Sequence, residues 1–577
     1  MTITATALSP DFREQALRRM ADEQFDVLVI GAGVVGAGAA LDAASRGLSV
    51  ALVEARDFAS GTSSRSSKLV HGGLRYLKQL NFHLVFEALR ERKLILERLC
   101  PHLARPVEFI YPLEKPVWDR AYVGAGVGVY DVLGAGRGVP HHLRHLSKQA
   151  TLRSFRSGKP GAIKGGIAFY EGQLDDARHT MMIARTAADY GVAVASSVRV
   201  TAFVRDGSGD GGAVTGAVAT DLEAGTEFTI RAAVTINAAG VWTDEIQAMI
   251  GGKGQFRVQA SKGVHVLVPR DRIDSDTGLI TETEKSLLFI IPCPWSDEFW
   301  IIGTTDTPWN LHLAHPAASR TDIDYILEHA NALLARPLTR DDVVGVYAGL
   351  RPLLAGESDS TSKLSREHAC VQPVPGLVVV AGGKYTTYRV MAKDAVDLAV
   401  SGLGRDVPGC VTDKVPLVGA VGYEALVATK ASLAARSGLG VEWIEHLLGR
   451  YGSAIREVLD LVAEHPELGR PLEHAPRYLA VEAYYGASHE GALHLDDLLA
   501  RRLRVSIDTW DRGIDVAGEV AGIVAPVLGW DAATIENEIE HYAKRVEAER
   551  DSQNQLDDQT ADAARLGAPE VRTGLSG

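Results

Sequence analysis

Three glycines near the start of the chain have the spacing of a phosphate-binding turn. Gly31, Gly33 and Gly36 form the pattern G-x-G-x-x-G within "GAGVVGAG". Such glycines permit a tight turn, leave room for a pyrophosphate beside the backbone and let a helix pack closely on a strand. The phosphates would lie at the positive end of the following helix. Glu54 follows at the distance where a carboxylate binds ribose hydroxyls, so the pattern predicts an ADP-containing cofactor, either NAD or FAD.

A second stretch combines cations with hydroxyl groups. Residues 63–79, "SSRSSKLVHGGLRYLKQ", contain four serines, two arginines, two lysines, a histidine and no acid, although the chain has a formal net charge of −13. Arginine and lysine bind phosphate groups, and histidine titrates near neutral pH. We therefore expect this stretch to meet an anionic ligand.

Hydrophobic periodicity predicts the elements that position these residues. Residues 25–30 form a short apolar run typical of a buried strand, a helix follows that ends at Gly47, and 48–55 is the next strand. Residues 376–400 repeat the order of apolar strand, glycine pair and helix, and 81–99 have helical spacing. Two such turns, far apart in sequence, predict one composite sheet assembled from both ends of the chain.

Composition limits the remaining possibilities. A chain of 577 residues with 46% hydrophobic content is long enough for several globular domains, and its 73 acids against 60 cations do not favour nucleic-acid binding. The cysteines lack metal-ligand spacing, so we predict no metal site, no disulfide framework and a reducing compartment. They are Cys100, Cys293, Cys370 and Cys410. Residues 1–24 lack a secretory core, and no segment has about 18 uninterrupted apolar residues, which predicts a cytoplasmic protein.

Nine fragments, in order, resemble a known family. They are "IGAGVVGAGAALDAASRGLSV", "SSKLVHGGLRYL", "LDDARHT", "NAAGVW", "KGVHVLVP", "IIGTTDT", "YAGLRPLL", "ESDS" and "GGKYTTYR". Together they closely resemble the FAD-dependent glycerol-3-phosphate dehydrogenases of bacteria, over about residues 25–400 and more loosely beyond. The resemblance implies non-covalent FAD rather than NAD and oxidation of sn-glycerol 3-phosphate to dihydroxyacetone phosphate. It also implies a peripheral position on the cytoplasmic face of the membrane and quinone as the electron acceptor.

The resemblance also implies the fold class. We expect an α/β protein whose Rossmann-like FAD-binding domain, of the glutathione-reductase type and similar to amino-acid oxidases, is interleaved with an α+β substrate domain. An α-helical C-terminal domain follows. The expected divisions are a polar leader at 1–24, the interleaved domains at 25–408, a helical domain at 409–550 and a disordered tail at 551–577. Within 25–408, the FAD-binding parts are expected at about 25–80, 168–250 and 366–405, and the substrate parts at about 81–167 and 251–365.

The implied reaction needs cations for a phosphate dianion and a base for the C2 hydroxyl. By resemblance, the substrate-binding residues are Arg75, Tyr76, His265, Arg351 and Lys384, and the catalytic residues are His71, His265, Arg351 and Lys384. The choice of base between His71 and His265 stays open, with a slight preference for His71 because it shares a segment with Arg75.

The same resemblance assigns the cofactor contacts. They are Gly31, Gly33, Gly36, Glu54, Ser66, Ser67, Lys68, Gly72, Gly240, Gly383, Lys384, Thr386 and Thr387. The helix after Gly383 is expected to direct its positive end at the flavin. One residue departs from the family pattern, because Arg65 stands where a small residue is expected between the serine pairs.

A second basic segment suggests a membrane contact. Between Asp131 and Glu171 there is no acid, whereas residues 137–164 contain seven lysines and arginines. Anionic lipid attracts each such cation by about 1 kcal/mol. A solvated loop and helix face is an equal alternative. A homodimer also stays open.

Other functions differ in acceptor or substrate. A glycerol-3-phosphate oxidase would pass its electrons to oxygen. An amine or amino-acid oxidase of the same flavoprotein class would leave the three phosphate-seeking cations unexplained. A flavin-dependent scaffold or RNA-modification partner is supported only by the helical C-terminal part.

Overall fold

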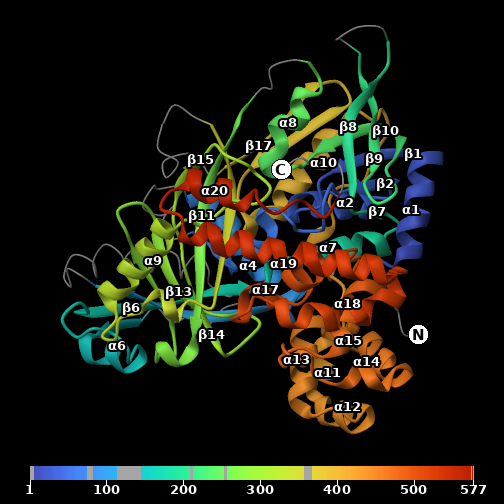
Figure 1. The fold of residues 1–577 in the computed structure, drawn as a ribbon. Coiled ribbons are helices and arrows are strands. Elements are labelled where there is room, and N and C mark those ends of the chain that lie inside the picture. The colour runs from blue at the N-terminus through green and yellow to red at the C-terminus, as the bar shows by residue number, and fades with distance from the viewer. Residues whose placement is uncertain are drawn as a thin grey trace.

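The first sheet combines strands from both ends of the chain. The computed structural model describes residues 5–73, 82–113, 144–207, 212–251, 256–355, 367–572 and 575. Within them, strands of the first sheet follow the order β17-β18-β10-β1-β2-β7, with β9 on β10 and β8 on β9 (Figure 1). The strands are β1 (Gln24–Ile30), β2 (Val50–Val53), β7 (Ala193–Ala195), β8 (Val198–Arg205), β9 (Val214–Asp221), β10 (Thr226–Asn237), β17 (His368–Val374) and β18 (Leu377–Gly382). The prediction of one composite sheet is therefore confirmed.

The centre of this sheet is parallel, which brings several strand ends together. β1 pairs in parallel with β2 and β10, and β10 pairs in parallel with β18. β1 is apolar and buried from Val27 onward, as a strand covered on both faces must be. Its chain then turns at Gly31, whose N–H donates to the carbonyl of Val53 at 2.8 Å, into α2 (Val34–Ser45). The glycine turn thus lies at the carboxyl edge of the sheet.

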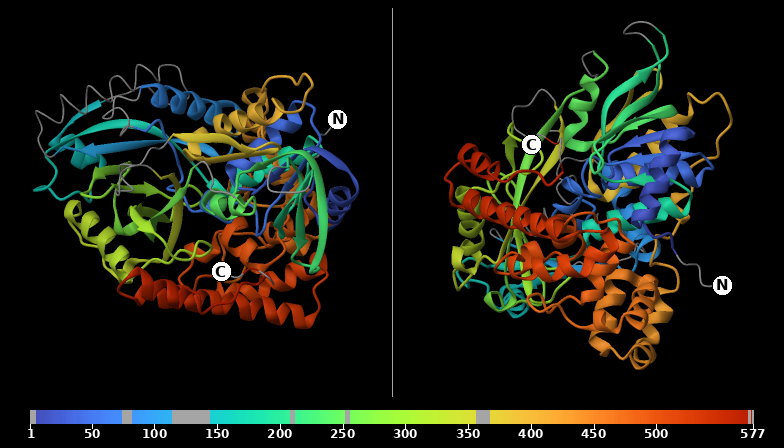
Figure 2. Two further views of the ribbon diagram at one scale, coloured as in Figure 1. Left: turned by 90° about the horizontal axis from the view of Figure 1, so that it is seen from above. Right: turned by 45° about the vertical axis from the view of Figure 1, so that its right-hand side comes forward.

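The second sheet is mixed and lies beside the first (Figure 2). Its order is β15-β11-β14-β13-β12-β4-β6-β3, with β16 on β11 and β5 on β6. The strands are β3 (Leu69–Val70), β4 (Ala104–Pro112), β5 (Arg144–Ser147), β6 (Gly165–Leu174), β11 (Val258–Pro269), β12 (Gly278–Glu282), β13 (Leu287–Pro292), β14 (Phe299–Gly303), β15 (Thr307–Trp309) and β16 (Gly345–Leu354). β3 and β6 belong to this sheet, although β3 and residues 168–174 of β6 lie in segments expected in the FAD-binding part.

Helices cover these sheets and form the C-terminal part. Those before residue 401 are α1 (Pro10–Asp22), α2, α4 (Phe82–Leu94), α6 (Lys148–Ser154), α7 (Asp176–Asp189), α8 (Thr243–Ala248), α9 (Arg320–Leu333) and α10 (Tyr388–Val400). Those after it are α11 (Tyr423–Ala428), α12 (Lys430–Ser437), α13 (Val441–Tyr451), α14 (Ile455–Glu464), α15 (Ala480–Ser488), α16 (Leu495–Asp497), α17 (Val505–Asp508), α18 (Ile514–Leu528), α19 (Ala532–Asn554) and α20 (Asp558–Arg565). The predicted α/β fold with a helical C-terminal part is confirmed.

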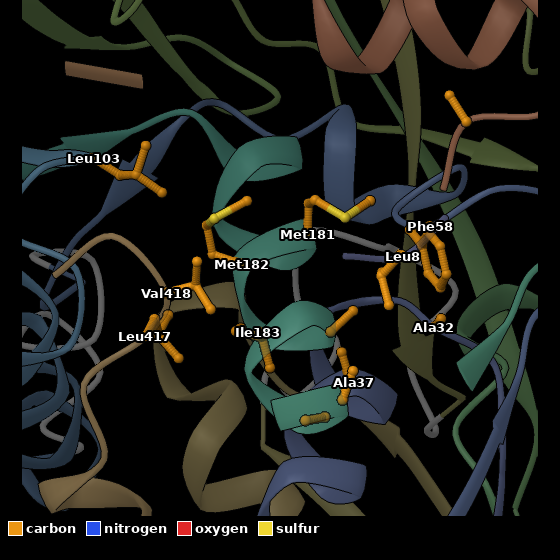
Figure 3. Packing of buried hydrophobic residues seen from close by; sticks show 14 of the residues in the cluster. Leu8, Ala32, Ala37, Phe58, Leu103, Met181, Met182, Ile183, Leu417 and Val418 are labelled. Carbon is orange, nitrogen blue, oxygen red and sulfur yellow. The ribbon is translucent and has the colours of Figure 1, made fainter. Parts of the chain in front are cut away.

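The C-terminal helices share a hydrophobic core with the first sheet. One cluster runs from β1 and α2 through α7 into α13–α18. Figure 3 shows α7 at its centre, with Met181 facing Leu8 and Phe58, and Met182 facing Leu417 and Val418. Because both sides of α7 are covered in this way, the helical part packs as a continuation of the core.

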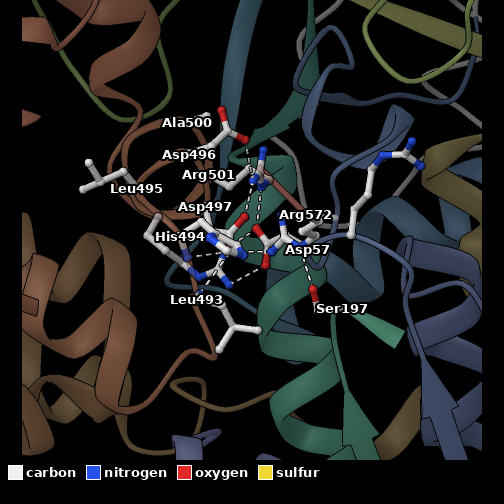
Figure 4. A network of polar contacts seen from close by, with 12 residues as sticks. Asp57, Ser197, Leu493, His494, Leu495, Asp496, Asp497, Ala500, Arg501 and Arg572 are labelled. Carbon is white, nitrogen blue, oxygen red and sulfur yellow. Dashed lines mark hydrogen bonds and ion pairs between the residues drawn. The ribbon is translucent and has the colours of Figure 1, made fainter. Parts of the chain in front are cut away.

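The end of the chain is ordered where a disordered tail was predicted. α19 continues to Asn554, α20 follows, and Arg565 and Arg572 are buried. In Figure 4, Arg572 reaches Asp497 and Ser197, at 2.7 and 2.8 Å. The tail prediction is thus wrong for 551–572, because buried ion pairs with distant segments hold a sequence that has no apolar pattern of its own.

A buried histidine lies in the same network (Figure 4). His494 contacts Glu223 at 3.0 Å and Glu538 at 2.7 Å. Burial and Arg572 lower the pKa of His494, but the two carboxylates outweigh them and raise it to about 9. His494 is therefore charged at neutral pH.

No helix in the part of the chain that the structure describes is long and apolar enough to cross a membrane.

Candidate active site

A cavity of about 450 Å³ lies where the two sheets meet. The first sheet contributes the ends of β1, β2 and β18, and the second contributes β11, β13 and β16. Of the predicted residues, those that line it are Gly31, Gly33, Glu54, Ser66, Ser67, His71, Gly240, His265, Arg351, Gly383, Lys384 and Thr386. Gly31 and Thr386, which are 355 positions apart, are thus brought to one site.

The glycine turn is closed so tightly that side chains would not fit. Gly31 has φ +99°, and a Cβ on Gly36 would lie 1.8 Å from the carbonyl oxygen of Gly31. Gly33 precedes α2, and the next N–H, of Val34, donates to Ser63 Oγ at 2.9 Å. The first turn of α2 contains no acid, so its positive end faces the cavity without a competing carboxylate.

Glu54 is fixed at the end of β2 by two backbone amides. The N–H groups of Ala32 and Arg56 donate to its carboxylate at 2.8 and 2.9 Å. Burial raises the pKa of Glu54, and these hydrogen bonds offset only part of that effect. The carboxylate is therefore held in place at the cavity wall, where it can accept hydrogen bonds from hydroxyl groups.

An apolar wall beside Glu54 was not predicted. Trp242, Ile246 and Met249 line this end of the cavity, and the Arg56 guanidinium lies 5.1 Å from the Trp242 ring. These residues follow the "NAAG" segment, whose sequence shows no spacing that would single them out. Of these residues, only Trp242 lies inside a fragment that resembles the family, "NAAGVW", and could have been predicted to line the site.

At the other end, Arg351 is held in a fixed orientation. Its Nη2 donates to Thr304 Oγ1 at 3.0 Å and to the carbonyl of Thr305 at 3.1 Å, and its Nη1 lies 3.8 Å from Asp306. The side chain retains 21% exposure. A guanidinium oriented in this way suits an anion such as phosphate, because its planar fork is already in position.

His265 lies near Arg351 on the neighbouring strand. Its ring stacks on Tyr347 with centroids 4.7 Å apart, and its Nε2 contacts Ser67 Oγ at 2.9 Å. Burial lowers the pKa of His265 well below its ordinary value, and the charges of Arg351 and Lys68 lower it further. The imidazole is therefore neutral at physiological pH and able to accept a proton.

His71 reaches the cavity from the basic stretch. Its backbone N–H donates to Thr386 Oγ1 at 3.1 Å, which joins this stretch to the turn that starts α10. Gly383 before that turn has φ +73°, and Gly240, which also lines the cavity, has φ +60°, so both positions favour glycine. Lys384 and Thr386 line the cavity directly.

Four predicted cofactor contacts do not line the cavity, and one of them, Gly36, lies in the tight turn behind it. Lys68 is fully buried, and its Nζ donates to Asp176 and to the carbonyl of Ser64, both at 2.6 Å. Burial lowers its pKa to about 8. Gly72 and Thr387 also lie outside the lining. The assignment of these residues to cofactor contact stays a prediction. Arg75 and Tyr76 lie outside the described residues.

The partner of Lys68 belongs to a buried ionic cluster that sequence reasoning missed. Asp176 accepts hydrogen bonds from the N–H and Oγ of Ser66, at 2.9 and 2.7 Å, and from Arg504 at 2.7 Å. Arg504 also binds Asp175 and comes from the C-terminal part. The pair of aspartates in "LDDARHT" was the available signal. The cluster fixes the serines of the basic stretch from behind the cavity.

Among the described residues, no three His, Cys, Asp or Glu side chains gather in a way that suits a metal ion.

Comparison with known proteins identifies the class first. The pattern of the FAD dependent oxidoreductase family matches residues 26–398, and that of the C-terminal domain of alpha-glycerophosphate oxidase matches residues 410–535. With the glycine turn and Glu54 in place, the chain belongs to the FAD-dependent oxidoreductases, and its cofactor is FAD.

Close relatives narrow the family. The chain is 57% identical to glycerol-3-phosphate dehydrogenase 2 of Mycobacterium tuberculosis, over 98% of this chain and 96% of that protein. It is 56% identical to the glycerol-3-phosphate dehydrogenase of Mycobacterium leprae, over 99% and 96%. The Bacillus halodurans glycerol-3-phosphate dehydrogenase complexed with FAD superposes with a TM-score of 0.77 at 29% identity, over 94% of this chain and 98% of that one. Within the class, the chain thus belongs to the glycerol-3-phosphate dehydrogenase family.

The residues present fit the cofactor. The tight turn at Gly31 and the helix end at Gly33 suit a pyrophosphate, and Glu54 suits a ribose. Gly383 and Lys384 line the end of the cavity near His265 and Arg351, where a flavin ring and a substrate would meet.

Proposed function

We propose that the chain oxidises sn-glycerol 3-phosphate to dihydroxyacetone phosphate, with FAD as the immediate acceptor and a membrane quinone as the final one. When bound, FAD accepts the hydride from C2 of the substrate at flavin N5. The observation that carries the proposal is the oriented, half-buried Arg351 beside the buried His265, in the same cavity as the glycine turn. An arginine beside a neutral histidine suits an anionic alcohol.

In this proposal Arg351 binds the substrate phosphate. Its two Nη2 hydrogen bonds keep the guanidinium at the cavity wall before substrate arrives, so little conformational entropy is lost on binding. Lys384 adds a second cation at the same end of the cavity. Together they would compensate a dianion that is removed from water.

His265 is proposed as the base that takes the proton of the C2 hydroxyl. The nearby charge of Arg351 contributes to the low pKa of His265. A phosphate dianion bound by Arg351 would neutralise much of that charge, so substrate binding itself would make the imidazole more basic. Ser67 and Tyr347 hold the ring in one orientation.

The choice of base is tested by the rate of flavin reduction in a single turnover. We expect His265→Asn to slow this step by roughly 10²–10⁴-fold with FAD retained, and His71→Asn to slow it far less. The reverse ranking would transfer the role of base to His71.

The substrate is tested by anaerobic titration of the FAD-loaded protein. We expect glycerol 3-phosphate to bleach the absorbance of oxidised flavin, and amino acids and secondary amines to leave it unchanged. Bleaching by an amine alone would replace the proposal by an amine or amino-acid oxidase.

The phosphate role is tested by Arg351→Ala. Loss of charge-assisted hydrogen bonds of about 1.5–3 kcal/mol should weaken substrate binding by roughly tenfold to a hundredfold or more, with FAD retained. Lys285, exposed two residues before the start of β13, provides a control as Lys285→Ala. Unchanged affinity in the Arg351 variant would remove Arg351 from the substrate site.

The acceptor is tested by comparing quinone reduction with hydrogen peroxide formation during turnover. We expect a soluble quinone to be reduced while little peroxide forms. Stoichiometric peroxide without quinone reduction would instead indicate a glycerol-3-phosphate oxidase.

The proposed membrane contact involves the described part of the basic segment, residues 144–164. Arg144, Lys148, Arg153, Arg156, Lys159 and Lys164 are exposed there, although Arg144 contacts Glu108 and Arg156 contacts Asp274 and Asp276. The three lysines and Arg153 are therefore the better candidates for anionic lipid. Arg137 and its neighbours up to 143 lie outside the described residues.

Vesicle sedimentation tests this contact. We expect binding to vesicles with anionic lipid, weakened by salt, and weaker binding after combined Lys148→Gln, Arg153→Gln and Lys164→Gln substitutions. Lys430→Gln and Lys544→Gln change a partly exposed and an exposed cation elsewhere and should leave binding intact. Equal binding to neutral vesicles would exclude an electrostatic contact.

A further inference from the structure

Two small cavities with a basic wall lie between the FAD-binding part and the last two helices. Their volumes are about 50 and 60 Å³, and the residues that line both are all basic. These shared residues are Arg65, His315, Arg501, Arg545 and Arg565. We call this region the arginine cavity. Arg65 comes from the basic stretch, whereas Arg545 and Arg565 come from α19 and α20.

Three of the five have carboxylate partners. Arg501 binds Asp57 and the two aspartates of α16, Asp496 and Asp497. Arg545 lies 2.6 Å from Asp496. His315 lies 2.8 Å from Glu570, which also contacts Arg56. The carboxylates around the cavity are thus already engaged by other cations.

The other two arginines have none. Within the described ranges, Arg65 forms no ion pair and donates only to the carbonyl of Ala314, at 3.2 Å, and Arg565 has no hydrogen-bond or ion-pair partner. Arg565 is only 6% exposed. Burial lowers the pKa of Arg65 to about 10, and the nearby charges of Arg501 and Arg545 lower it further. Burial also lowers the pKa of Arg565 and outweighs the charges of Glu549, Asp496 and Glu570. Two buried guanidinium groups with no carboxylate in ion-pair contact are costly, so this pair calls for an anion.

We propose that the arginine cavity binds a small oxyanion of the phosphate class between Arg65 and Arg565. A cavity needs a volume of roughly 10–15 Å³ on this measure to hold one water, so each space is large enough for a tetrahedral oxyanion and too small for a nucleotide. The forked guanidinium donors suit the paired oxygens of phosphate. Arg65 is also the residue that departs from the family pattern, and it lies between the main cavity and the arginine cavity, because it lines both.

An anion at this position would join the active-site stretch to the end of the chain. Arg65 immediately precedes Ser66 and Ser67, which line the main cavity, and its carbonyl oxygen would lie 2.5 Å from a Cβ on Gly349, two residues before Arg351. Arg565 is the last residue of α20. Bound phosphate would therefore stabilise the contact between α20 and the strand that carries Arg351.

Equilibrium dialysis of radiolabelled inorganic phosphate against the FAD-loaded protein tests the proposal. We expect a second phosphate per chain besides the one at the substrate site, with Arg565→Gln and Arg65→Ala each weakening the second by about tenfold or more. Arg351→Ala should remove only the first. Lys544→Gln, an exposed cation on α19, should change neither. Retained FAD and unchanged circular dichroism establish that each variant is folded.

Competition in the Arg351→Ala variant distinguishes the two sources of the phosphate group. Displacement by sulfate as well as by glycerol 3-phosphate indicates a site for free oxyanions, and displacement by glycerol 3-phosphate alone indicates the phosphoryl group of a metabolite. Phosphate uptake that both Arg565→Gln and Arg65→Ala leave unchanged would overturn the proposal. The Arg565→Gln and Arg65→Ala variants are compared with the unsubstituted protein, so this test does not depend on whether Arg351 binds substrate.

Discussion

Replacement of Arg504 by methionine is expected to destabilise the junction between the helical C-terminal part and the active-site stretch. Arg504 is 2% exposed, binds Asp175 and Asp176, and donates to the carbonyl of Ser64 at 3.2 Å. Burial raises the pKa of Asp175, but Arg504 outweighs burial and holds that pKa below its ordinary value. Methionine fills similar space without the charge and leaves Asp175 buried without its main partner.

The expected loss is about 3–5 kcal/mol, the range observed when one member of a buried ion pair is removed. This is a large fraction of the roughly 5–15 kcal/mol that stabilises a domain. Denaturant titration, followed by flavin fluorescence and by circular dichroism, measures the change. Arg156→Met is a matched control, because Arg156 also binds two aspartates but lies on the surface, so that little change is expected. A loss below about 1 kcal/mol in Arg504→Met would refute the reasoning.

Three further predictions concern the cofactor and pH. Gly36→Ala should abolish FAD retention, measured by flavin absorbance per protein, because its Cβ would meet the Gly31 carbonyl at 1.8 Å, whereas Gly161→Ala, in open space, should retain FAD. Glu54→Gln should weaken FAD affinity by roughly tenfold or more in a fluorescence titration, through loss of a charged acceptor. The pKa of His494 is raised to about 9 in the folded protein, so its protonated form stabilises the fold. This contribution to the free energy of unfolding is complete below pH 6.5 and decreases as pH rises toward 9. Wild type should therefore lose about 2 kcal/mol between pH 6.5 and 8 relative to His494→Gln, and equal slopes would contradict this.

Local sequence patterns predicted the parts of the site that depend on backbone geometry. The glycine spacing and the apolar runs beside it specify a strand, a tight turn and a helix, and the structure contains all three at Gly31–Gly36. The second glycine turn, at Gly383, follows the same logic. These features are predictable because each is determined by residues close together in the chain.

Features that depend on distant partners were missed. Lys68 has the residue type of a phosphate ligand, but its ammonium is bound by Asp176, 108 positions away. The region after Asn554 lacks a hydrophobic pattern. It is ordered because Arg572, near its end, binds Asp497. In both cases the sequence shows one charged residue, and only the folded chain shows which opposite charge it meets.

The helical C-terminal part is best understood as part of the active-site framework. Arg504 holds Asp176, Asp176 holds Ser66, and the adjacent Ser67 contacts His265. A chain of hydrogen-bonded and adjacent groups therefore extends from α17 to the proposed base. Because each buried charge in this chain needs its partner, shortening or replacing the C-terminal helices would release the serines that orient His265. The helices would then influence flavin reduction without contacting substrate. Such a role explains why the helical part packs into the same hydrophobic core as the first sheet.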